Sequence, residues 1–236
     1  MITAEHAARE SGSAASRLTL DIFIVDSDAK VRERLAAIIR AAGWQPRAFE
    51  SAEELLADPD SVVPGCIVLD IDLPGLSGLE LQQVLAERPG ISVIFASACR
   101  DVRLTVRAMK AGAVNFLTKP VDRDALVGAI AEALERSRAH LRRDAQDRVL
   151  RQRFGALSMR EREVMRLVID GRLNKQIASD LSIAEITVKV HRGRVMRKLG
   201  ATSLAELVRL GTKILGAGAH PTADSLALRQ LARTEV

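Results

Sequence analysis

Short apolar runs alternate with segments of helical spacing through the first half of the chain, and this alternation constrains the fold most. Residues 20–25, 66–69, 91–96 and 114–117 are rich in β-branched and aromatic side chains, and residues 45–49 form a weaker fifth run. Runs of this kind are typical of buried strands. Strands that alternate with helices predict an α/β fold, with a five-stranded, doubly wound parallel sheet covered on both faces.

Polar residues stand at or just past the carboxyl ends of four of these predicted strands. They are Asp26, Asp70, Ser97 and Lys119. Functional groups in open α/β sheets gather beyond the carboxyl ends of the strands, so we expect these four to converge on one spot. Taken singly, each has an ordinary explanation, such as a helix cap for an aspartate or a solvated surface charge for a lysine.

Together the four side chains provide what a phosphorylated aspartate needs. Neighbouring carboxylates repel one another unless a divalent cation or an ammonium group neutralises them. Mg²⁺ prefers oxygen ligands and keeps several waters, so it can bridge protein oxygens to a phosphate. Lys119 offers a compact positive charge, and Ser97 offers a hydroxyl that can hydrogen-bond a phosphoryl group. The sequence therefore predicts an aspartyl-phosphate site with Mg²⁺ as its cofactor.

The charges of the chain are unevenly distributed. The formal net charge is +5, yet residues 20–122 hold 11 Lys and Arg against 15 Asp and Glu. Residues 151–216 instead hold 14 Lys and Arg against 6 Asp and Glu. An acidic half suits a metal and phosphoryl site, whereas a basic half suits a polyanion. Two domains with separate partners are expected.

The basic half is predicted to be helical. Ser158 and Glu161 have the spacing of a capping box, and the helix they begin is expected to end at Gly171. A short helix over residues 174–181 and a longer one over residues 186–199 follow, joined by a tight connection. Two helices joined by a short turn, the second of them basic, are typical of a helix-turn-helix that enters the major groove. The buried stripe of the longer helix is expected to consist of Ile186, Val188, Val195 and Leu199.

Residues 20–122 resemble the receiver domain of two-component response regulators, which has a flavodoxin-like fold. Asp70, followed by Leu73, Pro74 and Gly78, matches the loop after the family's third strand. The resemblance makes Asp70 the phosphoacceptor. It also implies that Ser97 is the switch hydroxyl, Phe116 the switch aromatic, Lys119 the family's lysine and Pro120 a cis proline.

The end of the first strand departs from the family pattern. The family usually has two adjacent acids there, the second a direct Mg²⁺ ligand, but here Ser27 follows Asp26 and Asp28 is displaced by one residue. A hydroxyl is a weaker Mg²⁺ ligand than a carboxylate, so metal affinity should fall. Asp72, or otherwise Asp28, is expected to restore part of the charge, while Asp28 could instead only cap a helix. The expected metal-binding carboxylates are Asp26, Asp70 and Asp72.

Residues 154–215 resemble the four-helix, LuxR-type DNA-binding domain of FixJ/NarL regulators, and the order of the domains and the linker are most similar to the FixJ subgroup. The matching residues include Leu157-Ser158, Asn174-Lys175 and the run from Thr187 to His191. The resemblance implies base contacts from Lys189, Arg194 and Val190. It implies phosphate contacts from Asn174, Lys175, Thr187 and Arg197. His191 is expected to be buried or to face a phosphate. The full set of expected DNA contacts is Asn174, Lys175, Thr187, Lys189, Val190, Arg192, Gly193, Arg194 and Arg197.

The remaining segments are assigned from composition. Residues 1–19 are expected to be a disordered lead without the apolar core of a secretory signal, residues 137–153 a charged helical linker after a receiver domain of residues 20–136, and residues 216–236 a flexible tail. Whether the linker packs against a second copy stays open. The last helix of the DNA-binding domain is expected to expose Leu204, Leu207, Val208 and Leu210 for dimer contact. Cys66 and Cys99 are expected to be small buried hydrophobes, and no apolar run is long enough to span a membrane.

The sequence thus predicts a cytoplasmic response regulator rather than an enzyme. A sensor histidine kinase would phosphorylate Asp70, and the resulting homodimer would bind promoter DNA and, with RNA polymerase, activate transcription. One alternative is a regulator that acts without phosphorylation through a degenerate pocket. Another is a phosphatase of the haloacid-dehalogenase type, because Asp70-Ile71-Asp72 resembles that family's DxD motif, although Pro74 and the DNA-binding half argue against it.

Overall fold

A computed structural model describes residues 20–59, 61 and 63–217, which form two compact units that divide after Arg142. The expected lead (residues 1–19) lies outside the described residues, as do residues 218–236 of the expected tail. In the part of the chain that the structure describes, every helix is too short or too polar to cross a bilayer.

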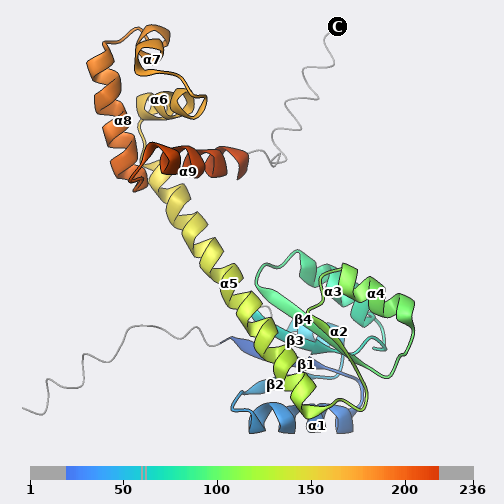
Figure 1. The fold of residues 1–236 in the computed structure, drawn as a ribbon. Coiled ribbons are helices and arrows are strands. Elements are labelled where there is room, and N and C mark those ends of the chain that lie inside the picture. The colour runs from blue at the N-terminus through green and yellow to red at the C-terminus, as the bar shows by residue number, and fades with distance from the viewer. Residues whose placement is uncertain (1–19, 60, 62, 218–236) are drawn as a thin grey trace, which may run out of the picture. The chain divides into compact units, whose positions relative to one another are not determined.

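The first unit is built around a parallel sheet whose strand order is β2-β1-β3-β4-β5 (Figure 1). This confirms the five-stranded parallel sheet predicted from the alternating pattern. The order reverses between β1 and β3, and in open α/β sheets ligands bind beyond the carboxyl ends of the strands at such a point. The strands are β1 (Asp21–Val25), β2 (Pro46–Phe49), β3 (Gly65–Leu69), β4 (Ile91–Ser97) and β5 (Asn115–Thr118).

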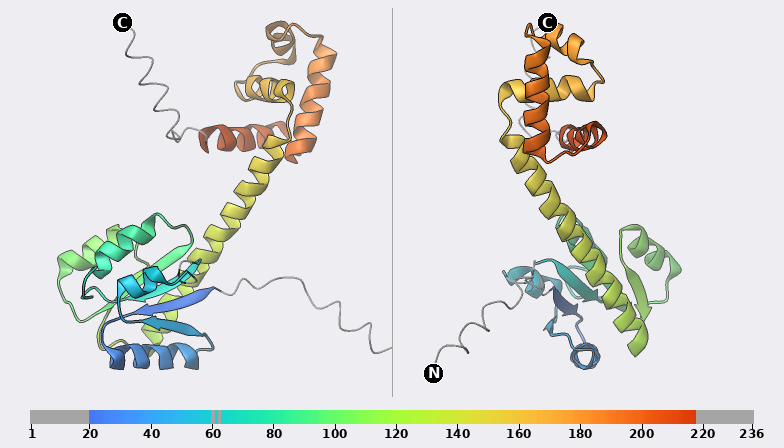
Figure 2. Two further views of the ribbon diagram at one scale, coloured as in Figure 1. Left: turned by 180° about the vertical axis from the view of Figure 1, so that it is seen from behind. Right: turned by 60° about the vertical axis from the view of Figure 1, so that its left-hand side comes forward.

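Helices cover both faces of this sheet (Figures 1 and 2). The helices are α1 (Ala29–Ala41), α2 (Ala52–Ala57), α3 (Gly78–Ala86), α4 (Val102–Lys110) and α5 (Arg123–Gly155). Side chains of α1 and α5, such as Ile39 and Ile130, pack with Ile24 and Val68 on one face. Side chains of α2, α3 and α4 pack with alternate residues of the same strands on the other face. The central strands β1, β3 and β4 are therefore held between two apolar layers, whereas the edge strand β2 buries Phe49 alone.

The six-residue helix α2 is not predicted by apolar spacing, because it is too short to show a periodic stripe. Its start is fixed by Ser51, whose side chain accepts a hydrogen bond from the backbone N–H of Glu54 at 3.1 Å. Ala52 and Leu55 then fall on the buried side. A local cap and two apolar residues are thus enough to add this helix to the sheet.

The second unit contains helices around one apolar core. They are α6 (Met159–Ile169), α7 (Asn174–Asp180), α8 (Glu185–Leu199) and α9 (Leu204–Ala217). The capping box predicted for Ser158 and Glu161 is present at the start of α6. Gly200 ends α8 with a φ of 74°, a left-handed conformation that glycine adopts without strain. The predicted helix-turn-helix corresponds to α7 and α8.

Two of the predicted burial patterns in this unit are wrong. Ile186 is 66% exposed, because its position two residues before Val188 places it about 160° around α8 from Val188, away from the core that holds Val188, Val195 and Leu199. Leu207 is fully buried, because α9 packs this residue, with the half-buried Leu210 and Ile214, into the core of the unit. Of the residues expected on the surface of α9, Leu204 is the one that remains largely exposed, at 48%.

The range expected to be a linker lies within the continuous helix α5. Ser137 is buried in the first unit, where its hydroxyl donates to the carbonyl of Gly65 at 2.9 Å. Leu150 is buried in the core of the second unit. Both cysteines are free: Cys66 is buried, as expected, whereas Cys99 is only half-buried.

Candidate functional site

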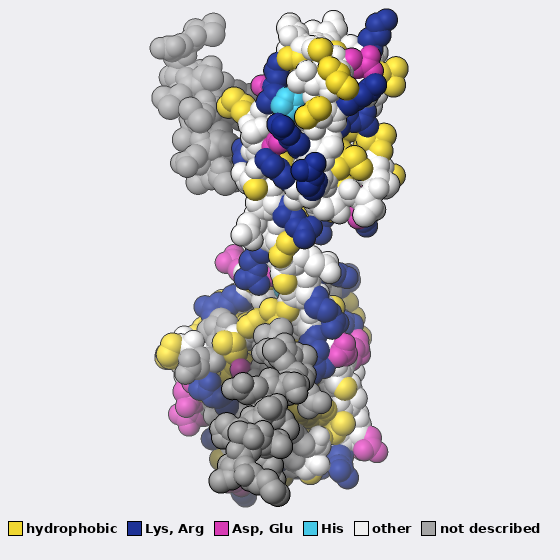
Figure 3. Space-filling view, turned by 90° about the vertical axis from the view of Figure 1, so that its left-hand side faces the viewer, with side chains coloured by type: hydrophobic (Ala, Val, Ile, Leu, Met, Phe, Trp, Pro, Cys, Tyr) yellow, Lys and Arg dark blue, Asp and Glu magenta, His cyan; other side chains and the backbone are white. Residues whose placement is uncertain are grey.

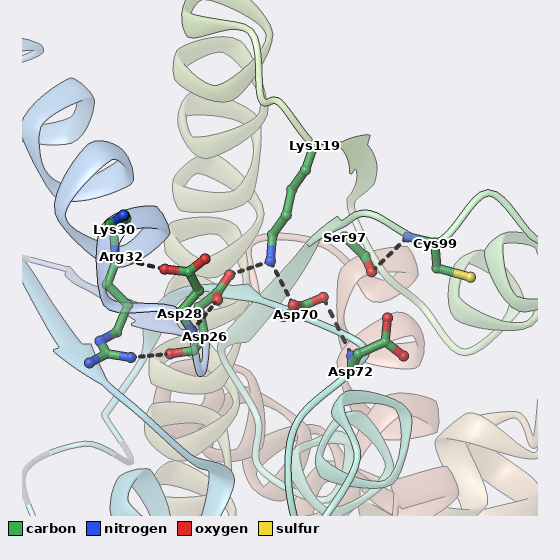
Figure 4. A network of polar contacts seen from close by, with 9 residues as sticks. All are labelled: Asp26, Asp28, Lys30, Arg32, Asp70, Asp72, Ser97, Cys99 and Lys119. Carbon is green, nitrogen blue, oxygen red and sulfur yellow. Dashed lines mark hydrogen bonds and ion pairs between the residues drawn. The ribbon is translucent and has the colours of Figure 1, made fainter.

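The four polar residues at strand ends meet at the carboxyl edge of the sheet (Figure 4). Asp26 follows β1 and Asp70 follows β3, and the backbone N–H of Asp70 donates to the carbonyl of Val25 at 2.9 Å. Ser97 ends β4, and its carbonyl accepts from the backbone N–H of Lys119 at 2.9 Å. The hydrogen-bond ladder therefore continues past the strand ends and fixes these backbones side by side.

The Lys119 ammonium group lies between the two aspartates. Its Nζ is 2.6 Å from Oδ2 of Asp26 and 2.6 Å from Oδ2 of Asp70. Asp26 is 1% exposed and Asp70 is 7% exposed, so both carboxylates are largely removed from water. Partial burial lowers the pKa of Lys119, but hydrogen bonds and charge attraction from Asp26 and Asp70 outweigh this effect and raise the pKa above its usual value. The lysine therefore stays charged and offsets part of the negative charge of the pair.

Each carboxylate uses its other oxygen to hold the loop that follows it. Oδ1 of Asp26 accepts from the backbone N–H of Asp28 at 3.0 Å, and Oδ1 of Asp70 accepts from the backbone N–H of Asp72 at 3.4 Å. The guanidinium of Arg32 donates to the backbone carbonyl of Asp26 at 2.6 Å. The pocket is thus preorganised by main-chain contacts.

Ser97 and Phe116 lie at the β4 and β5 side of this pocket. Ser97 is fully buried, and its hydroxyl oxygen accepts from the backbone N–H of Cys99 at 3.2 Å. Phe116 is half-buried and packs against Phe95, with ring centroids 6.1 Å apart. The Lys119–Pro120 peptide bond is cis, as the family resemblance implied.

The acids expected to compensate for Ser27 do not complete a cage of carboxylates. Asp28 is exposed and caps α1, accepting from the backbone N–H of Lys30 at 2.8 Å. Asp72 is also exposed. No group of three Asp, Glu, His or Cys side chains in the described ranges is placed to hold a metal ion. Mg²⁺ commonly binds one or two carboxylates and keeps its remaining waters, so Asp26 and Asp70 still fit this ion.

Two further contacts, one in each unit, could not be predicted from the sequence. The Glu53 carboxylate accepts from the backbone N–H of Leu76 at 2.8 Å and so ties α2 to the loop after β3. Glu161 is 3% exposed and lies 2.7 Å from the Nζ of Lys198, which joins the start of α6 to the end of α8. Burial raises the pKa of Glu161, but hydrogen bonds from Lys198 and Ser158 outweigh it and lower the pKa overall. Both pairs are distant in sequence, and only the fold brings them together.

The exposed side of α8 carries most of the residues expected to contact DNA. Lys189, Val190, Gly193, Arg194 and Arg197 are all exposed. In the space-filling view, Lys and Arg side chains gather with hydrophobic ones on the side of the second unit that faces the viewer (Figure 3). An array of cations on one helix suits the phosphate backbone of a nucleic acid.

Three of the residues expected to contact DNA are engaged within the unit itself. The guanidinium of Arg192 donates to the side-chain oxygen of Asn174, so the two residues link α8 to the start of α7. Lys189 lies 3.7 Å from the carboxylate of Glu185, one turn away. Lys175 is exposed and Thr187 is half-buried. His191 is half-buried, and its Nδ1 is a buried atom without a hydrogen-bond partner in the described part of the chain.

Known proteins similar to this chain share both halves. A family model described as the response regulator receiver domain matches residues 22–131, and one described as bacterial regulatory proteins of the luxR family matches residues 155–210. Nodulation protein W of Bradyrhizobium diazoefficiens is 46% identical over 204 residues, which covers 85% of this chain and 88% of that protein. The transcriptional regulatory protein FixJ of Azorhizobium caulinodans is 40% identical over 211 residues, covering 88% of this chain and 97% of that protein.

Solved structures show the same combination. The response regulator StyR is similar with a TM-score of 0.70 at 44% identity, covering 83% of this chain and 99% of that chain. Full-length FixJ from B. japonicum is similar with a TM-score of 0.50 at 36% identity, covering 81% of this chain and 95% of that chain. The likeness therefore extends over both compact units.

Proposed function

We propose that this chain, which belongs to the response regulators that join a receiver domain to a LuxR-type DNA-binding domain, is switched by phosphorylation of Asp70. The observation that carries this proposal is the position of Asp70. Its carboxylate stands at the carboxyl edge of the sheet, 2.6 Å from the Lys119 ammonium group, beside Asp26 and close to the chain segment that carries Ser97. A nucleophile, a second acid, a cation and a hydroxyl are thus available for phosphoryl chemistry.

A sensor histidine kinase is the proposed donor. An oxygen of Asp70 forms a bond to the phosphorus of a phosphohistidine, the phosphorus–nitrogen bond breaks, and the imidazole leaves as the aspartyl phosphate forms. When bound by Asp26 and Asp70, Mg²⁺ supplies positive charge that offsets the negative charge of the phosphoryl oxygens. Lys119 is placed to pair with a phosphoryl oxygen, since it already bridges the two carboxylates.

The response is proposed to begin at Ser97 and Phe116. The Ser97 hydroxyl can exchange its contact with the N–H of Cys99 for one with a phosphoryl oxygen. Phe116 can then move out of its half-buried position against Phe95. Such movements change the surface around α4 and β5, and we propose that this change favours a homodimer.

The dimer is proposed to bind paired half-sites in promoter DNA and to activate transcription with RNA polymerase. The exposed basic side of α8 supports DNA binding, with Arg194 and Arg197 among its cations. The names of the relatives, which include the transcriptional regulatory protein FixJ, support a role in transcription. We place the protein in the cytoplasm, where it can reach promoter DNA, without contact with a membrane.

One observation favours an alternative in which DNA binding is independent of phosphorylation. Ser27 is an exposed serine at the position where the family usually has its second acid, so the pocket offers one Mg²⁺ ligand fewer. Weak Mg²⁺ binding would slow phosphoryl transfer, because the charges of Asp70 and the incoming phosphate would be less well neutralised.

The direct test is incubation of the full chain with acetyl phosphate and Mg²⁺, followed by measurement of the intact mass and of the dimer fraction. We expect one added phosphoryl group and more dimer, and neither change in the Asp70→Asn variant. Asp124→Asn is the matched control, because Asp124 is an exposed aspartate in the first turn of α5. An unmodified wild type that still binds promoter DNA would favour the alternative.

A further inference from the structure

Two apolar side chains are exposed on α8, among the charged side chains of its solvent-facing side. Ile186 is 66% exposed and Val190 is 46% exposed. They are four residues apart, so their side chains are neighbours on the same face of the helix. Burying an exposed Ile or Val stabilises a complex, which makes such a pair on a solvent-facing helix a candidate for contact with a partner.

The pair lies opposite the core of its own unit. Val188, Val195 and Leu199 are fully buried and define the inner side of α8. With about 100° of rotation per residue, Ile186 and Val190 each point within about 20° of the direction opposite that inner side. Lys189 and Arg194 flank this direction, and Arg197 lies along it. The apolar pair is therefore central on the exposed face and bordered by cations.

Gly193 shares this face, and the fold does not require a glycine there. A Cβ built at Gly193 has no neighbouring atom within 4 Å, and the residue has no positive φ. Glycine inside a helix is less stable than alanine by about 1 kcal/mol. The missing side chain leaves the backbone of α8 open at Gly193, so another molecule can approach the helix closely there.

We propose that Ile186, together with Val190, reads the 5-methyl group of a thymine in the major groove, and that Gly193 lets α8 approach closely enough for this contact. The proposal rests on the proposed DNA binding. In the major groove only thymine carries a methyl group, and apolar side chains distinguish it from the other bases. Ile186 is the second residue of α8, and the first residues of a recognition helix are the ones that contact base edges. The flanking cations suit the phosphates on either side of the groove.

Two random-sequence DNA libraries provide the test, one made with thymine and one with uracil, which differs by the missing methyl group. The full-length protein, with acetyl phosphate and Mg²⁺, is used to select bound duplexes from both. We expect selected sites to show a thymine preference that is absent from the uracil library. On the best site, exchange of that thymine for uracil should raise Kd about fourfold, which corresponds to ~0.8 kcal/mol for one buried methyl group.

Three variants assign the effect to the proposed residues. Ile186→Ala, which keeps Val190, should reduce the difference in Kd between the thymine and uracil forms of the site to clearly less than fourfold. Met159→Ala is the matched control, because Met159 is an exposed apolar residue outside α8, 81% exposed, and this variant should keep the fourfold difference. Gly193→Ala should melt at a higher temperature than the wild type and yet bind the site more weakly, a combination that a folding defect cannot produce.

The outcomes separate this inference from the function on which it rests. Failure to select any site from either library would contradict DNA binding itself. Selection of the same site with equal Kd from both libraries would contradict the methyl contact alone. An Ile186→Ala variant that binds DNA like the wild type but no longer activates transcription would also contradict the methyl contact. That result would assign Ile186 to contact with a protein partner.

Discussion

Replacement of Lys119 by methionine should destabilise the first unit, because it leaves two neighbouring carboxylates without their shared cation. Lys119 lies 2.6 Å from both Asp26 and Asp70, and these side chains are only 2% and 8% exposed. Removal of one partner from a buried ion pair costs about 3–5 kcal/mol. The lysine side chain is 16% exposed, and solvent screens part of this interaction, so we expect a loss near 2 kcal/mol.

Urea denaturation followed by circular dichroism measures this loss. Lys110→Met is the matched control: Lys110 is exposed at the end of α4, and its loss should change the free energy of unfolding by no more than about 0.5 kcal/mol. Because the pKa of Lys119 is raised in the folded state, its contribution should be complete below the unfolded value of about 10.4 and disappear as the pH rises through the folded pKa. Mg²⁺ should stabilise Lys119→Met more than the wild type. Equal unfolding free energies for the two methionine variants would refute the reasoning.

Three further results are expected. Ser27→Asp should bind Mg²⁺ more tightly than the wild type in a fluorescence or calorimetric titration, because it adds a carboxylate beside Asp26; equal affinities would show that this position does not face the ion. Glu161→Gln should lower the free energy of unfolding by about 1 kcal/mol at neutral pH. Because the pKa of Glu161 is lowered in the folded state, its contribution to stability is present above its ordinary pKa and is lost as the pH falls through the folded pKa. The free energy of unfolding of Glu161→Gln should therefore fall less steeply in acid than that of the control variant Glu163→Gln. Equal slopes for the two variants would contradict this prediction. Ser97→Ala should take up phosphate from acetyl phosphate but show less gain in dimer than the wild type, and a full gain would remove Ser97 from the switch.

The sheet could be predicted because each strand carries its own signal. A buried parallel strand is apolar along its whole length, and the acids or lysine that follow it mark its end. The convergence of Asp26, Asp70 and Lys119 then follows from topology, since the carboxyl ends of parallel strands share one edge. The helix α2 left no such signal, because its six residues are too few for a periodic pattern.

The partners of individual side chains could not be predicted in the same way. The contact between Arg192 and Asn174 joins two helices, and so does the one between Glu161 and Lys198. Their formation depends on how the helices pack. Ile186 is a different case: helical spacing of about 100° per residue already places it on the opposite side of α8 from Val188, so its predicted burial did not fit the helical period.

The most direct test of the account is the affinity of the full chain for its selected DNA site before and after treatment with acetyl phosphate and Mg²⁺, measured side by side for the wild type and Asp70→Asn. Control of DNA binding through Asp70 predicts tighter binding by the treated wild type and no change for the variant. Equal affinity of the wild type before and after the uptake of one phosphoryl group would contradict the claim that Asp70 controls DNA binding.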